Sequence, residues 1–151
     1  MSKQDLIASA RANIDKFGWH CLSVSPSQGQ PGTRFTYTIG LEATFRHPEL
    51  MIFGLDNRLS HGLLSDCVDR IRAGTTFAPD TPYPGILGGG YDVVFKPVRA
   101  ADLPAYFALA DRVYDGAPYR GLVLFWPDER RRFPWEETAS TAQRDALAIV
   151  E

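Results

Sequence analysis

The stretch FTYTIGLEATFRHPELMIFGL, residues 35–55, decides the fold. Its first five residues alternate apolar and polar side chains, which is typical of a strand that is buried on one face. Its last six, LMIFGL at 50–55, form a continuous apolar run that suits a central strand covered on both faces. The segment between them carries the tripeptide His47-Pro48-Glu49. The stretch therefore predicts two adjacent strands joined by a polar loop, which is either a simple turn or the edge of a site.

The same patterns predict the other elements along the chain. Apolar residues at helical spacing indicate helices, and short apolar or alternating runs indicate further strands. A loop rich in proline and glycine, 74–91, is long by globular standards, and long loops are often functional. The predicted helices cover 3–17, 59–73, 102–115 and 141–151, and the additional strands cover 19–25, 92–98 and 121–126. Because adjacent strands have short connections, we expect an α+β fold with a mixed or antiparallel sheet of about five strands and flanking helices.

Length and composition favour one soluble globular domain that spans residues 1–151. The chain is 44% hydrophobic and 23% charged, with a formal net charge of −2. This charge gives no electrostatic footprint for nucleic acid and no basic patch for a lipid surface. No signal peptide and no membrane-spanning run is present, so we expect a cytoplasmic protein. In a reducing compartment, Cys21 and Cys67 are expected to be free, buried thiols.

Strong catalytic motifs are absent from the sequence. It contains no GxGxxG, no GxxxxGK[ST], no HExxH, no GxSxG and no paired CxxC. The three histidines, His20, His47 and His61, match no metal-binding spacing. The sequence therefore predicts no metal and no cofactor, and it leaves open whether the protein is an enzyme.

His47 and Glu49 are the first candidate site residues. Pro48 biases His47 toward an extended backbone, so the imidazole and the Glu49 carboxylate can lie on one side of the loop. Such a pair can perform acid–base catalysis. It can equally fix a turn through hydrogen bonds, and both interpretations stay open at this point.

A second cluster of candidates lies in FWPDERRRFPWEE, residues 125–137. Trp126 and Trp135 can form the wall of a ligand pocket to which Asp128 contributes a polar group. The alternative is that the two indoles close the core at the end of a sheet. The run Arg130-Arg131-Arg132 is expected to be a solvated hairpin tip.

Three motifs resemble a bacterial family, the domain of unknown function 4262. They are YTIGL at 37–41, HPELMIFGL at 47–55 and WPDERRRFPWE at 126–136. The likeness extends from about residue 18 to about residue 137, with the terminal helices outside it. Many relatives carry a glutamine before W-P-D, where this chain has apolar residues at 122–125. The resemblance implies a small, soluble bacterial protein with no established activity, and it raises the motif residues above the other candidates.

Three interpretations of function follow. The first is a binding module for a small ligand or a protein partner. Its cleft would be lined by Tyr37, His47, Trp126 and Trp135, with the 74–91 loop as a lid. In it, the His47–Glu49 loop and the Trp126–Asp128 corner would converge on one site.

The second interpretation is an enzyme, either with acid–base chemistry at His47 and Glu49 or of the split-barrel flavin-reductase type. The latter rests on a loose analogy with the strand–loop–strand pattern at 35–55 and makes flavin the cofactor to test. The third is a homodimer formed through exposed aromatic corners.

Overall fold

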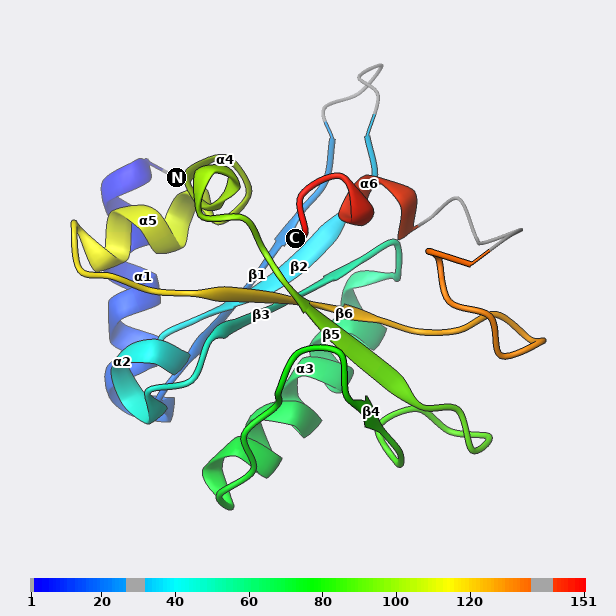
Figure 1. Ribbon diagram of the computed structural model, residues 1–151. Coiled ribbons are helices and arrows are strands. Elements are labelled where there is room, and N and C mark those ends of the chain that lie inside the picture. The colour runs from blue at the N-terminus through cyan, green and yellow to red at the C-terminus, as the bar shows by residue number, and fades with distance from the viewer. Residues whose placement is uncertain (1, 27–31, 137–142) are drawn as a thin grey trace.

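The computed structural model describes residues 2–26, 32–136 and 143–151, and it confirms an α+β fold with a mixed sheet and flanking helices. The sheet has six strands in the order β1-β2-β3-β6-β5-β4 (Figure 1). The strands are β1 His20–Val24, β2 Phe35–Ile39, β3 Glu49–Phe53, β4 Pro82–Tyr83, β5 Val93–Pro97 and β6 Gly121–Phe125. The helices are α1 Lys3–Phe17, α2 Leu41–Phe45, α3 Asn57–Arg72, α4 Leu103–Tyr106, α5 Ala108–Tyr114 and α6 Arg144–Leu147, with a 3₁₀ turn, η1, at Ala100–Asp102.

Four of the five strand pairs are antiparallel, and β3 pairs with β6 in parallel. The parallel register sets Glu49 opposite Gly121 and Ile52 opposite Leu124. The starts of β3 and β6 therefore lie at the same end of the sheet. The sheet is open, with β1 and β4 at its edges, so the split-barrel architecture expected for a flavin reductase is wrong. Flavin binding itself stays a prediction.

Two apolar layers sandwich the sheet, because successive side chains of each strand point to opposite faces. On one face, α1, α4, α5 and α6 cover Met51 and Phe53 of β3. On the other face, α3 and the segment after it cover Leu50 and Ile52. Figure 1 shows α3 below the sheet and α4, α5 and α6 above it, and α1 packs in the same apolar layer as these three helices. The continuous apolar run at 50–55 is thus explained by a strand covered on both faces.

Local sequence signals set the ends of the two long helices. Ser2 and Asp5 form a capping box at the start of α1, and Gly18 ends it in a left-handed conformation with φ 90°. The Asp56 side chain caps α3 by accepting a hydrogen bond from the N–H of Leu59. Both helices lie within two residues of their predicted bounds.

Several element predictions were wrong. The polar loop between β2 and β3 contains the short helix α2, and the loop at 74–91 contains the two-residue strand β4. The helix expected at 102–115 is divided at Phe107, whose backbone leaves the helical region with ψ 45° and whose ring is buried in the core. The last helix is shorter than predicted, because Val150 forms a bridge with Val98. Its expected first residues, 141–142, lie outside the described part of the chain.

Among the described residues, none of the helices has the length and apolar character needed to cross a membrane.

Candidate functional site

The Glu49 carboxylate occupies a cradle of hydrogen-bond donors at the start of β3. The side chain is fully buried. Three backbone N–H groups, those of residues 40–42, donate to it at 3.1–3.2 Å. The hydroxyl of Thr38 donates at 2.8 Å, and the hydroxyl of Tyr114 also donates. One carboxylate thereby anchors the first turn of α2 and ties it to α5.

The motif residues around Gly40 explain how the chain makes this cradle. Gly40 has φ 111°, a left-handed conformation that aims the following N–H groups at Glu49. A Cβ there would lie 2.9 Å from Cγ1 of Ile14, so the packing also requires glycine. The Thr38 hydroxyl in turn accepts a hydrogen bond from the N–H of Leu50 at 2.9 Å. The motifs TIGL and HPEL therefore form one structural unit.

Electrostatics at this site combine two opposing effects. Burial raises the pKa of Glu49 to about 7, although its five hydrogen bonds favour the charged form. Burial and the neighbouring Glu49 charge raise the pKa of Tyr114. With its lone pairs taken by protein donors, the carboxylate is arranged to hold α2 in place.

His47 is also buried, with 3% of its surface exposed, and both of its ring nitrogens have partners. Nε2 accepts a hydrogen bond from the N–H of Phe77 at 3.0 Å, and Nδ1 donates to the carbonyl of Pro48 at 2.8 Å. Burial lowers the pKa of His47, in keeping with a neutral ring. His47 thus attaches the loop at 74–91 to the start of β3, while Glu49 attaches α2. The predicted catalytic role of this pair stays a prediction.

Tyr37 lies in the core under α5. Its hydroxyl accepts a hydrogen bond from the N–H of Leu109 at 3.0 Å, and its ring meets that of Phe107 edge-on at 4.9 Å. Burial raises the pKa of Tyr37 to about 12. These contacts show how the tyrosine connects β2 to the helices above it.

The Trp126–Asp128 corner is a hydrogen-bonded turn. Oδ1 of Asp128 accepts from the N–H groups of Arg130 and Arg132 at 2.9 Å, and Oδ2 accepts from Nε of Arg132 at 3.1 Å. Hydrogen bonds from the Arg132 backbone lower the pKa of Asp128. Gln143, just before α6, accepts from the N–H of Trp126 at 3.0 Å and donates to its carbonyl at 2.9 Å. This corner therefore fastens the C-terminal segment to the end of β6.

Trp135 lies on the surface beside this corner, with 41% of its area exposed. Its ring stacks on Phe133 at 4.8 Å, and Nζ of Lys96 sits 4.4 Å from the ring centroid. Phe125 meets the same ring edge-on at 5.5 Å. Trp135 thus packs against Phe133, Phe125 and Lys96 at the end of the core and keeps part of its surface exposed.

The parallel pairing of β3 with β6 separates the two motif clusters. Glu49 pairs with Gly121 at the start of β6, whereas Trp126 follows its last residue. Five residues of strand, at roughly 3.3 Å each, put about 16 Å between these ends. The prediction that the two clusters converge on one cleft is therefore wrong.

A cavity of about 480 Å³ lies beside the His47-Pro48-Glu49 motif. It opens at the end of the sheet where β6 begins, and mostly apolar side chains from five separate segments form its walls. The apolar lining residues are Pro48, Phe77, Ala78, Pro79, Pro97, Val98, Ala100, Leu103 and Leu122. Sequence reasoning found Pro48 and the 74–91 loop, but it did not find the walls supplied by 97–103 and 119–122.

The cavity also has a small polar part. Arg120 lines it and forms an ion pair with Glu42 at 2.9 Å, and it donates to the carbonyl of Arg46 at 3.2 Å. Tyr119 also lines it, and its hydroxyl donates to Asp111 at 3.0 Å. Arg120 and Tyr119 are thus held in place by partners outside the cavity, and Thr76 and Glu151 complete its polar lining.

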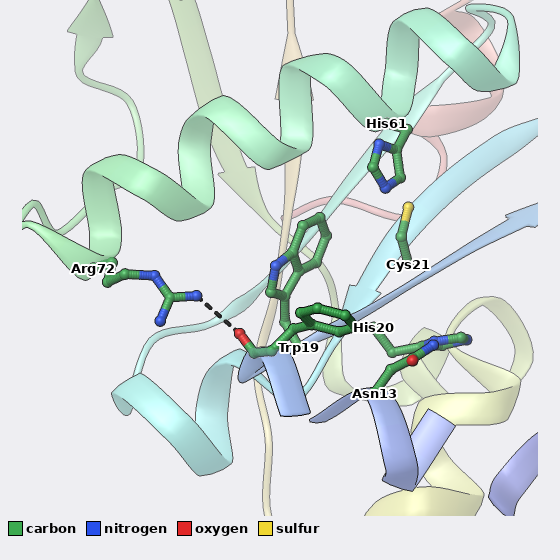
Figure 2. Close-up of a pocket in the computed structure, with 7 residues that line it drawn as sticks. Asn13, Trp19, His20, Cys21, His61 and Arg72 are labelled. Atoms are coloured by element: carbon green, nitrogen blue, oxygen red, sulfur yellow. Dashed lines mark hydrogen bonds between the residues drawn. The ribbon is translucent and has the colours of Figure 1, made fainter. Parts of the chain in front are cut away.

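A second hollow, of about 440 Å³, surrounds the start of β1 (Figure 2). Its polar side chains already have contacts. Asn13 lies within hydrogen-bond distance of His20 at 2.9 Å, and the ring of His61 stacks on Trp19 at 5.8 Å. Burial raises the pKa of Cys21 to about 11, so the thiol is protonated at neutral pH. Figure 2 shows side chains from α1, β1 and α3 around this hollow.

Metal binding finds no support in the described residues, among which no group of three or more His, Cys, Asp or Glu side chains is placed to hold an ion. No shared role was predicted for His20 and His61, and the fold brings both to the second hollow. The spacing of the two histidines in the sequence does not predict this proximity, because His20 starts β1, His61 lies on α3, and the two elements come together only in the folded chain.

Comparison with known proteins agrees with the motifs. A family model described as a domain of unknown function, DUF4262, matches residues 13–140. No curated protein matches the chain, and no solved structure matches it.

Proposed function

The chain belongs to the DUF4262 family, whose function is unknown, and we propose that it is a binding module for a small, mostly apolar molecule. The observation that carries this proposal is the cavity of about 480 Å³ beside Pro48. Its volume lies in the range of small-molecule sites, which are typically apolar with a few polar groups.

The motif residues support the walls of this cavity. His47 holds Phe77, which lies in one wall, and Pro48 lines the cavity itself. Glu49 fixes α2, whose Glu42 positions the Arg120 guanidinium at the cavity. The motif residues thus hold the cavity walls in place. This favours a binding function, since preformed walls lower the entropic cost of holding a ligand.

Arg120 and Glu151 line this site with one charge of each sign. Because Glu42 also pairs with Arg120, the site does not demand an acidic ligand. We therefore propose a ligand that is largely apolar and carries at most one polar group near Arg120.

An enzymatic role for His47 and Glu49 has less support. The Glu49 carboxylate is fully buried among five donors, and both nitrogens of His47 are occupied. Proton transfer needs a group within hydrogen-bond reach of the substrate. A cytoplasmic location is part of the proposal and is supported by the two cysteines, Cys21 and Cys67, which are both free.

The test is titration with N-phenyl-1-naphthylamine, a neutral apolar probe that fluoresces strongly outside water. We expect saturable binding of one probe per chain, and a loss of affinity of about tenfold or more in Ala100→Trp, whose indole would occupy the cavity. Ala101→Trp is the matched control, because Ala101 is the next residue of the same 3₁₀ turn and does not line the cavity. Equal affinity in the two variants, or no saturable binding, would contradict the proposal.

A further inference from the structure

We propose that the second hollow, at the start of β1, binds a small molecule that combines a flat aromatic ring with one acidic group, such as an aromatic carboxylate. Its volume of about 440 Å³ lies in the range of small-molecule sites. The described residues that line it include none of those that line the cavity beside Pro48. This inference therefore does not depend on the proposed function.

Aromatic side chains supply the surface for a flat ring. Phe17, the last residue of α1, lines the hollow and is 53% exposed, the highest value among the large apolar side chains of the described residues. Trp19 lines it too and is half-buried, and the ring of His61 stacks on this indole at 5.8 Å between centroids. Exposed apolar area is unfavourable in water, and aromatic rings prefer to stack on one another. An aromatic ligand would cover this surface.

The charge of the hollow selects a ligand with an acidic group. The described residues that line it contain no aspartate or glutamate, although acidic residues outnumber basic ones in the whole chain by 18 to 16. His20 is paired with Asn13, and burial lowers the pKa of His20, so its ring is neutral at neutral pH. Arg72 therefore gives the hollow a fixed positive charge that no lining residue of the described chain balances.

The Arg72 guanidinium is held in place and still has open donors. Its Nη2 donates to the carbonyl of Phe17 at 2.9 Å, and its central carbon lies 5.1 Å from the ring centroid of Phe45. With the described residues it makes this one hydrogen bond and no ion pair, so most of its N–H groups are open to a ligand. A planar guanidinium with parallel N–H groups matches the two oxygens of a carboxylate.

Charge and aromatic surface lie next to each other in this hollow. The carbonyl that Arg72 binds belongs to Phe17, whose ring lines the same hollow. Figure 2 shows this bond, with Arg72 on one side of the Trp19 indole and His61 on the other. One small molecule can therefore place its ring against the aromatic side chains while its acidic group meets the guanidinium.

Arg72 also has a structural role, which the test must separate from ligand binding. The Phe17 carbonyl is at the end of α1, where helix carbonyls have no partner within the helix. This role needs the bond to Phe17, but it does not need the open N–H groups or the exposed Phe17 ring. Because Arg72 is exposed, water and salt weaken its attraction for an anion. We therefore expect rapid exchange and loss of this ligand during purification.

The first test compares two fluorescent probes that differ by one acidic group. The probe 8-anilino-1-naphthalenesulfonate has the ring system of N-phenyl-1-naphthylamine plus a sulfonate. Both are titrated into Ala100→Trp, whose other cavity is filled. We expect one sulfonate probe to bind per chain, about tenfold or more tighter than the neutral probe, with an affinity that falls as salt is added. Equal affinity for the two probes, or no saturable binding of the sulfonate, overturns the proposal.

Variants of the otherwise wild-type chain test the two halves of the site without relying on Ala100→Trp. We expect Arg72→Gln to weaken the binding of the sulfonate probe by about tenfold or more. The matched control is Arg70→Gln on the same helix. The Arg70 side chain also donates to a backbone carbonyl at 2.9 Å, that of Gly85, but it does not line the hollow. Equal losses in these two variants, or no loss in Arg72→Gln, overturn the proposal.

Phe17→Ser keeps the result independent of the structural role of Arg72. It removes the exposed ring and leaves the backbone carbonyl that Arg72 binds. We expect it also to weaken the binding of the sulfonate probe by about tenfold, with a melting temperature close to that of the wild type. Leu59→Ser, at another exposed apolar residue that does not line the hollow, is the control and should leave the affinity unchanged. Unchanged affinity in Phe17→Ser overturns the proposal.

Discussion

The backbone N–H of Phe77 donates a hydrogen bond to Nε2 of His47 at 3.0 Å, across thirty residues of sequence. The bond joins the loop at 74–91 to the start of β3, and the two rings also meet edge-on at 5.9 Å. Since Phe77 and Pro48 line the same cavity, this contact sets the distance between two of its walls. His47 therefore shapes the cavity indirectly, by fixing the position of Phe77 in its wall.

Replacement of His47 by alanine should release the loop. We expect His47→Ala to lower the free energy of unfolding by about 2–3 kcal/mol, because it leaves the buried N–H of Phe77 without an acceptor. Hydrogen exchange at the Phe77 amide should become faster, and the cavity should bind the apolar probe less tightly. His61→Ala, at an exposed histidine on α3, is the control that should change neither the exchange at Phe77 nor the affinity for the probe. Unchanged exchange at Phe77 would rule out the clamp.

Replacement of Glu49 by glutamine should lower the stability of the fold, although the two side chains have the same shape. The glutamine NH₂ group would face N–H or O–H donors in the cradle, where the carboxylate accepts from all five. We expect Glu49→Gln to lower the free energy of unfolding by about 3 kcal/mol, as measured by urea denaturation. Glu42→Gln, which removes only a surface ion pair, should cost less than about 1 kcal/mol. Similar losses in both variants would contradict the cradle.

Glu49 should also make stability depend on pH. Its pKa is raised from 4.5 to about 7 in the folded chain, so between these values the folded state binds more protons than the unfolded state. The free energy of unfolding should therefore rise as the pH falls through 7 toward 4.5. His20 and His47, whose pKa values are lowered, act in the opposite direction below about 6.5.

The comparison with Glu49→Gln separates these contributions, because both histidines are present in both proteins. The stability advantage of the wild type over the variant should grow by on the order of 3 kcal/mol between pH 8 and pH 4.5. Urea denaturation at a series of pH values measures it. A difference that stays constant with pH would show that Glu49 remains charged throughout.

Gln143 should contribute to stability through the Trp126 backbone. Its side chain is buried and pairs with both the N–H and the carbonyl of Trp126. We expect Gln143→Ala to lower the free energy of unfolding by about 1–3 kcal/mol, because both main-chain groups lose their partner. Gln4→Ala, on the exposed side of α1, should have an effect within about 0.5 kcal/mol. A thermal melt of each variant gives the comparison, and equal melting temperatures would contradict this role.

The parts of the fold that depend on local patterns could be predicted from the sequence. The alternation at 35–39, the apolar run at 50–55 and the helical spacing of apolar residues act within a few positions of one another. They placed both long helices and five of the six strands. The α2 helix was missed because its first turn is stabilised by Glu49, which follows it in sequence and reaches back to it.

The candidate site was harder to predict because it depends on how distant segments meet. The motifs singled out His47, Pro48 and Glu49, whose role in a site stays a prediction, but the neighbours of these residues come from the loop around Phe77 and from β6. The choice between parallel and antiparallel pairing of β3 with β6 decides which end of the sheet Trp126 occupies, and no local pattern encodes it. Antiparallel pairing would have placed the two motifs together.

Native mass spectrometry of the purified protein, compared with denaturing spectra, tests most directly whether the cavity beside Pro48 holds a small molecule. The wild type and Ala101→Trp should carry an added mass that is lost on denaturation, and Ala100→Trp should lack it. Two results would contradict the account. One is an added mass that Ala100→Trp retains. The other is no added mass on the wild type or on either variant, even after incubation with N-phenyl-1-naphthylamine.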